Sequence, residues 1–155
     1  MKSTYSFVAL VGALCIAAAC SKAAEKAPSL VVIDVLNPEL YNDAHIKNSI
    51  SVPFEEVAQY VKKLDPKTEV VVYCSNYMCS ASGMSAQEFK AQGFEKVWAF
   101  EGGMAEWYQL GYPTEGPATK DLWRAPNNKP AAQEHDFPVI TAQELKAKME
   151  QHKLL

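Results

Sequence analysis

The stretch EVVVYCSNYMCSASGMSAQEFKAQGF, residues 69–94, decides how this chain folds. Val70 to Tyr73 form an unbroken β-branched and aromatic run, which is typical of a strand buried on both faces of a parallel sheet. Cys74 follows at once, then a short loop, and then a helix that we expect to begin near Ser80 or Ser82. This order predicts an α/β fold in which the cysteine loop lies at the carboxyl end of the strand.

Cys74, between a buried strand and a helix N-terminus, is predicted to be a nucleophile. The unpaired N–H groups at a helix N-terminus stabilise an anion, and they therefore favour thiolate over thiol. The helix dipole alone contributes roughly 0.3–1 kcal/mol, and up to about 2 kcal/mol in a sheltered geometry, so the loop amides must supply the rest. We expect a cradle of main-chain amides around the Cys74 sulfur.

Three ordered motifs resemble the rhodanese (thiosulfate sulfurtransferase) homology family. They are VVIDVLNPELYNDAHIKNSISVPFEEV at residues 31–57, the cysteine stretch, and FEGGMAEWYQLGYP at residues 100–113. In that family the cysteine after the strand, here Cys74, takes up a sulfur atom as a persulfide and passes it to an acceptor. The resemblance implies a three-layer fold with a parallel sheet flanked by helices. It also implies a sulfurtransferase that needs no cofactor, with thiosulfate or a persulfide as donor and a thiol or cyanide as acceptor.

The active-site loop departs from familiar rhodanese loops. It resembles a subgroup with a cysteine-x4-cysteine spacing, but it holds neither lysine nor arginine, and Arg124 is the only arginine in the chain. Related phosphatases and arsenate reductases clamp an oxyanion with cysteine-x5-arginine, whereas position 80 is serine, so phosphatase activity is not expected. A thiosulfate dianion would meet only amides and hydroxyls, which predicts weak thiosulfate turnover or a persulfide or polysulfide donor. The loop residues after Cys74 are Ser75, Asn76, Tyr77, Met78, Cys79 and Ser80.

Asp34, His45 and Ser82 are predicted to support the site. Asp34 lies in an apolar run over residues 30–35, and a buried acid is costly unless it is hydrogen-bonded. The family resemblance implies that Asp34 and His45 tie loops near the cysteine. Leu36 stands where the family usually carries an arginine.

Cys79 leaves several interpretations open. It could attack the persulfide, release sulfide and close a Cys74–Cys79 disulfide, or act as a resolving thiol that limits over-oxidation. A purely structural disulfide would close a short loop and gain little entropy. No second Cys/His pair sits at ligand spacing, so no metal is expected. A thiol–disulfide redox protein and a catalytically silent binding module remain alternative functions.

Residues 1–20 are predicted to be an export signal. The apolar or small stretch from Tyr5 to Ala19 is too short for a comfortable membrane span but suits a signal-peptide core. The end, Ala17-Ala18-Ala19-Cys20, resembles a bacterial lipobox, although Ala17 replaces the usual leucine. We expect a periplasmic protein held at the outer membrane by lipid on Cys20, with residues 21–29 as a tether. Soluble export and an uncleaved anchor are the alternatives.

The chain has 155 residues and a 48% hydrophobic content, which fits one domain with a core. Its formal net charge of −3 argues against a nucleic-acid partner. The oligomeric state is not predicted. Besides the strands and helix above, we expect a helical turn over 38–42, strands over 49–52 and 96–100, and helices over 54–64 and after residue 103. Trp98 and Trp107 are expected to lie in the core.

The C-terminal end contains an unexpected second β–α pattern. Residues 30–116 form the rhodanese-like domain and residues 117–135 a linker, whereas residues 136–155 carry a short strand and a Thr141/Glu144 capping box before a helix. This segment resembles the first strand and helix of rhodanese domains, which residues 21–29 lack. We expect it to fold back into that place, as a circular permutation. The alternatives are the stump of a second domain or a free amphipathic helix.

Overall fold

The computed structural model describes residues 30–131 and 134–155. The expected export signal, the lipidation site at Cys20 and the tether over 21–29 therefore lie outside the described residues, and they stay predictions. Within the described ranges, no helix combines the length and the apolar character needed to cross a membrane.

A four-stranded parallel sheet in the order β3-β1-β4-β5 forms the centre of the fold. Its core strand β4 (Glu69–Tyr73) has no exposed surface from Val70 to Tyr73, as the continuous apolar run predicts. The other strands are β1 (Leu30–Asp34), β3 (Ile50–Ser51) and β5 (Val97–Phe100). The predicted α/β class with a parallel sheet is confirmed.

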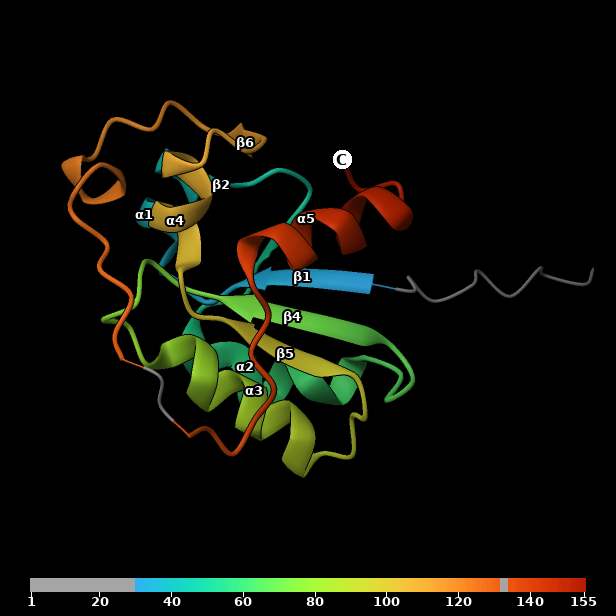
Figure 1. The fold of residues 1–155 in the computed structure, drawn as a ribbon. Coiled ribbons are helices and arrows are strands. Elements are labelled where there is room, and N and C mark those ends of the chain that lie inside the picture. The colour runs from blue at the N-terminus through green and yellow to red at the C-terminus, as the bar shows by residue number, and fades with distance from the viewer. Residues whose placement is uncertain (1–29, 132–133) are drawn as a thin grey trace, which may run out of the picture.

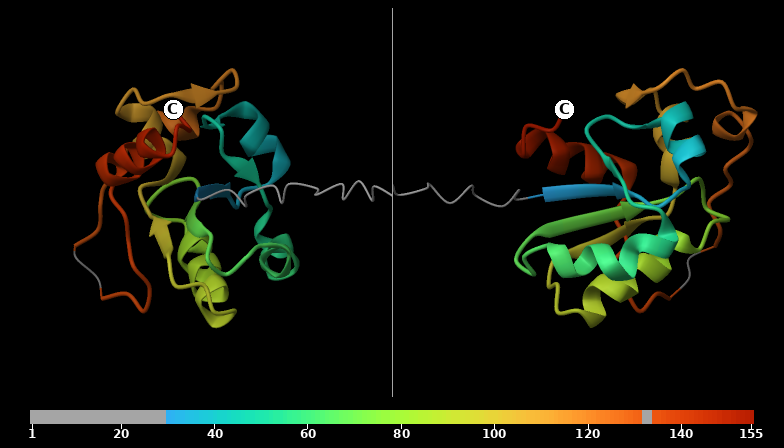
Figure 2. Two further views of the ribbon diagram at one scale, coloured as in Figure 1. Left: turned by 90° about the vertical axis from the view of Figure 1, so that its right-hand side faces the viewer. Right: turned by 180° about the vertical axis from the view of Figure 1, so that it is seen from behind.

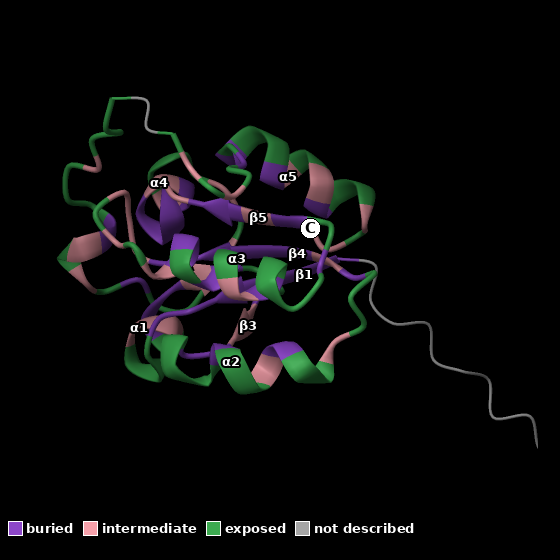
Figure 3. Cartoon of the chain, turned by 90° about the horizontal axis from the view of Figure 1, so that it is seen from below, coloured by how far each residue is buried: buried purple, intermediate pink, exposed green. Residues whose placement is uncertain are grey.

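Helices cover both faces of this sheet and give it three layers (Figures 1 and 2). One face carries α2 (Val57–Tyr60) and α3 (Ala81–Ala91), and the other carries α1 (Pro38–Asp43), α4 (Gly103–Gln109) and α5 (Ala142–Gln151). Figure 3 shows the buried strands β1 and β4 behind α3, whose outer turns are partly exposed. The helix expected over 54–64 is instead a single α turn between two 3-10 turns, η1 (Phe54–Glu56) and η2 (Val61–Lys63).

A small antiparallel sheet that the sequence did not predict joins β2 (His45–Ile46) to β6 (Thr114–Glu115). Each strand has only two residues, which is too short for an alternating pattern to be recognised. The pairing nevertheless brings residues 114–116 close to the end of α1.

The C-terminal residues lie against the same sheet. Val139 forms a parallel bridge with Ala99 of β5, and the amide of Ile140 donates to the carbonyl of Ala99 at 3.0 Å. The predicted capping box opens α5, whose Leu145 and Met149 are fully buried. The β–α pattern of this segment therefore extends the domain beside β5. Trp98, expected in the core, is half-buried, and the Lys148 ammonium lies 4.4 Å from the centre of its ring.

The segment expected to be a linker is anchored to α1, chiefly by the carboxylate of Asp43. Asp43 accepts hydrogen bonds from the amides of Thr119 and Lys120 and, at 2.6 Å, from the indole of Trp123. The hydroxyl of Thr119 also donates to it, and these donors hold the pKa of Asp43 well below its ordinary value. Trp123, in the short helix η3 (Asp121–Trp123), is completely buried.

Candidate active site

The loop after β4 is fixed from behind by the start of α4. The amide of Met104 donates to the carbonyl of Cys74 and the amide of Ala105 to the carbonyl of Ser75, both at 2.9 Å. Gly103 adopts a positive φ of 61°, and a Cβ at this position would lie 2.5 Å from the Cys74 carbonyl oxygen. Only glycine lets the two segments approach so closely.

Cys74 and Cys79 are both free thiols and lie in contact. Cys74 has no exposed surface, whereas Cys79 is half-buried. The Cys74 sulfur lies 3.2 Å from the Cys79 carbonyl oxygen and 3.6 Å from the hydroxyl oxygen of Ser82. An inner thiol and an outer sulfur are thus stacked at the carboxyl end of β4.

Main-chain amides reach both sulfurs, that of Ser82 at Cys74 and those of Ser75 and Ala81 at Cys79. Hydrogen bonding to Cys79, followed by burial, raises the pKa of Cys74. The hydrogen bond from Cys74, together with the amides of Ala81 and Ser75, lowers the pKa of Cys79. These opposite shifts favour a pair that shares one proton, with the lower pKa on Cys79 and not on Cys74, where the sequence predicted the thiolate.

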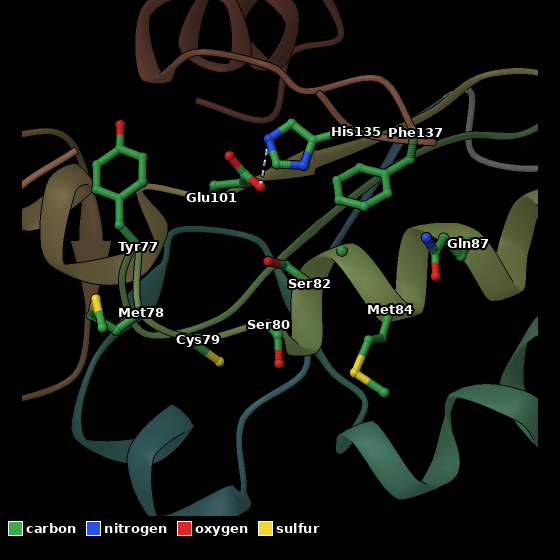
Figure 4. A pocket seen from close by; sticks show the side chains of 11 residues that line it. Tyr77, Met78, Cys79, Ser80, Ser82, Met84, Gln87, Glu101, His135 and Phe137 are labelled. Carbon is green, nitrogen blue, oxygen red and sulfur yellow. Dashed lines mark ion pairs between the residues drawn. The ribbon is translucent and has the colours of Figure 1, made fainter. Parts of the chain in front are cut away.

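A pocket of about 250 Å³ opens above the cysteine loop (Figure 4). Cys79 and Ser82 line it, whereas Cys74 does not line it and contacts both of these residues. A ligand in the pocket would therefore meet Cys79 first. The lining residues are Tyr77, Met78, Cys79, Ser80, Ser82, Gly83, Met84, Gln87, Glu101, His135 and Phe137.

The remaining loop residues hold the shape of the loop. The side chain of Asn76 accepts a hydrogen bond from the amide of Met78 at 3.0 Å, and its carbonyl accepts one from Cys79, also at 3.0 Å. The Tyr77 hydroxyl donates to Glu106 at 3.0 Å, and burial raises the pKa of this phenol. Met78 is 90% exposed, and Ser80 precedes the first turn of α3 without capping it through its side chain.

The three predicted supporting residues lie in different places. Asp34 is fully buried at the end of β1, where its Oδ1 accepts from the amide of Leu36 at 2.8 Å. Its Oδ2 has no hydrogen-bond partner among the described residues, and burial raises its pKa to about 7. Ser82 contacts Cys74 directly. His45 stacks on Tyr41 and lies 3.2 Å from Glu115, so it joins α1 to the β2–β6 sheet and does not line the pocket.

Sequence reasoning missed one wall of the pocket. We call residues 134–140 the return segment, because they bring the chain back across α3 to the edge of β5. This segment contributes His135 and Phe137 to the pocket, and Asn127 pins the loop by accepting from the Tyr77 amide at 3.1 Å. No local pattern in the sequence marks His135 or Phe137 as pocket residues.

Fold and site together define an α/β protein whose parallel sheet presents a cysteine loop at its carboxyl edge. The Rhodanese-like domain family profile matches residues 17–110, more than half of the chain. The chain belongs to the rhodanese-like domain family.

Curated relatives agree with this assignment. Thiosulfate sulfurtransferase GlpE of Coxiella burnetii is 32% identical over 82 residues, which span 53% of this chain and 75% of the relative. The protein of the same name from Vibrio cholerae is 29% identical over 84 residues, spanning 54% of this chain and 77% of the relative. These matches support a role as a sulfurtransferase or sulfur carrier. The cysteine-x4-cysteine subgroup stays a prediction.

Solved structures show the same fold. BH2092 protein from Bacillus halodurans superposes with a TM-score of 0.55 at 28% identity, covering 61% of this chain and 70% of that one. The rhodanese-like domain of Alr3790 protein from Anabaena sp. gives a TM-score of 0.53 at 26% identity, covering 73% of this chain and 79% of that one.

Proposed function

We propose that this chain is an exported sulfurtransferase that passes a sulfane sulfur through a persulfide on Cys74 to a thiol or cyanide acceptor. Family membership and the sulfurtransferase relatives support the class of reaction. The observation that carries the proposal is the contact between Cys74 and Cys79 at the carboxyl end of β4, where Cys79 lines a pocket and the two thiols have pKa values shifted in opposite directions. A nucleophile in hydrogen-bond contact with its own proton acceptor is the arrangement that covalent catalysis requires.

In the first step, Cys74 attacks the outer sulfur of the donor while its proton moves to the Cys79 thiolate. With thiosulfate, the new S–S bond forms on Cys74, the S–S bond of the donor breaks, and sulfite leaves with that electron pair. The donor sulfur has to pass between Cys79 and Ser82, which line the pocket above Cys74. The α3 N-terminus and the loop amides then face the persulfide anion.

In the second step, a thiolate or cyanide attacks the outer sulfur of the persulfide. The acceptor leaves as a persulfide or as thiocyanate, and the electron pair of the broken S–S bond returns to Cys74. Both steps exchange one S–S or C–S bond for another, so the cycle needs no external oxidant or cofactor.

The same pair favours a second candidate, thiol–disulfide exchange, because the outer and more acidic sulfur belongs to Cys79. Cys79 would attack a substrate disulfide, and Cys74 would then displace it. The substrate leaves as two thiols, and the two protein cysteines are oxidised to a Cys74–Cys79 disulfide.

Mass spectrometry after treatment with thiosulfate or polysulfide tests the proposal. We expect wild-type protein to gain the mass of one sulfur atom, Cys74→Ser to gain none, and Cys79→Ser to load about a hundredfold more slowly, as for loss of one general base. Loading retained by Cys74→Ser and lost by Cys79→Ser would move the persulfide to Cys79. Loss of two hydrogens in wild type, with no sulfur added to Cys79→Ser, would favour disulfide exchange, whereas the same loss with sulfur retained by Cys79→Ser would mean that Cys79 resolves the persulfide. No change at all in either protein would indicate a silent module.

A further inference from the structure

The pocket above the cysteines holds one basic side chain, and it comes from outside the active-site loop. Of the residues that line this pocket, only His135 carries a basic group, and it belongs to the return segment. Lys129, on the same part of the chain, lines a neighbouring hollow instead. Tertiary structure therefore brings to the pocket a basic side chain that the active-site loop itself does not supply.

Two contacts hold His135 in the pocket wall, and a third holds the ring it packs against. Its Nε2 lies 3.4 Å from Oε1 of Glu101, and the two side chains are only 22% and 24% exposed. Its ring packs against Phe137, with ring centroids 5.0 Å apart. Phe137 in turn lies over the first turn of α3, where a Cβ at Gly83 would come within 2.5 Å of its ring. Figure 4 shows both rings on the opposite side of the pocket from Cys79.

We propose that His135 is the side chain that binds the anionic end of the sulfur donor while the sulfur to be transferred points towards the cysteines. This inference rests on the proposed sulfurtransferase function and names the residue that selects its donor. When it is protonated, the His135 ring can donate a charge-assisted hydrogen bond across the pocket to a sulfonate or sulfinate oxygen, which is stronger than the bond that a neutral hydroxyl gives.

Because His135 pairs with Glu101, its removal should weaken the binding of an anionic donor in a second way. While the ion pair is intact, the imidazolium offsets the Glu101 carboxylate within the pocket wall. Without the imidazole, the Glu101 carboxylate has no partner in the pocket wall. The donor then loses its attraction to His135 and is repelled by Glu101. The consequence should grow with the charge of the donor.

A charge series of donors tests the proposal on the full-length exported protein. Thiosulfate is a dianion and methanethiosulfonate a monoanion, and each gives up its outer sulfur to form the same protein persulfide. We expect His135→Gln to raise KM for thiosulfate about tenfold, the loss of one charge-assisted hydrogen bond, with kcat changed less than about twofold. The rise in KM for methanethiosulfonate should be smaller, and His135→Lys should restore thiosulfate KM.

Lys129→Gln is the matched control, since it removes a positive charge from the same part of the chain but outside this pocket. We expect its KM values to equal those of wild type. Equal losses with the two donors, a loss confined to kcat, or no rescue by lysine would overturn the role of His135. Failure of wild-type protein to load sulfur from either donor would instead overturn the sulfurtransferase function.

Discussion

The region from β4 to α3 and the return segment line the same pocket, but they are held there by different kinds of interaction. Strand, cysteine loop and helix are continuous in sequence, and the α4 amides and Gly103 lock the loop. The return segment arrives from the far end of the chain and is held by Phe137 on Gly83, His135 on Glu101 and a bridge from Val139 to Ala99. The first region carries the reacting sulfurs, and the second completes the walls around them.

This difference bears on how the domain is built. We propose that Val139, Ile140 and α5 take the place of the strand and helix that usually open a rhodanese domain, so that the chain is circularly permuted. The parallel bridge beside β5 and the buried face of α5 support this proposal. It also explains why a chain segment crosses α3, since the last strand has to be reached from the end of α4.

Removing residues 136–155 is expected to have the largest effect. Ile140, Leu145 and Met149 are at most 5% exposed, and burial of each such side chain contributes about 1.5–3 kcal/mol, so their joint loss approaches the whole stability of a domain. We expect the truncated chain to lose cooperative thermal unfolding by circular dichroism. Leu145→Ala should cost about 2–5 kcal/mol. Leu110→Ala, at a side chain 42% exposed, should cost far less. An unchanged melting temperature on truncation would refute the permutation.

Cys74→Ser tests the local region alone. We expect sulfur transfer to fall by more than about a thousandfold, because the covalent intermediate cannot form. Among the described residues, the Cys74 side chain forms hydrogen bonds within the loop and to α3, and none to the return segment. The melting temperature should therefore change little. Steady-state thiocyanate formation and a thermal melt on the same sample measure the two quantities. Activity within tenfold of wild type would contradict the assignment.

Alkylation should reveal which sulfur carries the charge at rest. The lowered pKa of Cys79 means that its thiolate persists as the pH falls below the range of an ordinary cysteine, whereas the buried Cys74 stays protonated. We expect iodoacetamide to label Cys79 first, with a pH midpoint well below that of free cysteine. Peptide mapping across a pH series measures this. If Cys74 were labelled first, Cys74 and not Cys79 would carry the charge at rest.

Asp34→Asn should remove a pH dependence of stability. Burial raises the pKa of Asp34 from 3.8 to about 7, so the folded state holds its proton more tightly than the unfolded state. This contribution is fully present below pH 3.8 and is lost as the pH rises through about 7. Urea unfolding of wild type relative to Asp34→Asn should therefore show stability falling over that interval only in wild type. Parallel curves for the two proteins would disprove this account.

Gly83→Ala should have the smallest effect, and it acts through the return segment. The added methyl group would press on the Phe137 ring and displace His135 beside it. We expect KM for thiosulfate to rise about threefold, less than a full charge-assisted hydrogen bond is worth, with kcat nearly unchanged. Phe137→Ala removes the ring that the new methyl group would press on. The KM for thiosulfate of Gly83→Ala/Phe137→Ala should therefore equal that of Phe137→Ala alone. A loss confined to kcat would place the disturbance at the cysteines instead.

The sequence by itself determined the parallel sheet, the buried β4, the cysteine loop before α3 and the capping box of α5. Each of these depends on residues close together in the chain, where periodicity and capping chemistry are legible. Tertiary structure alone decided that Cys74 contacts Cys79 and Ser82, that Asp43 anchors η3, and that His135 faces the pocket. Those outcomes depend on which distant groups share one space, and a burial energy or a hydrogen bond between distant residues leaves no pattern in the intervening sequence.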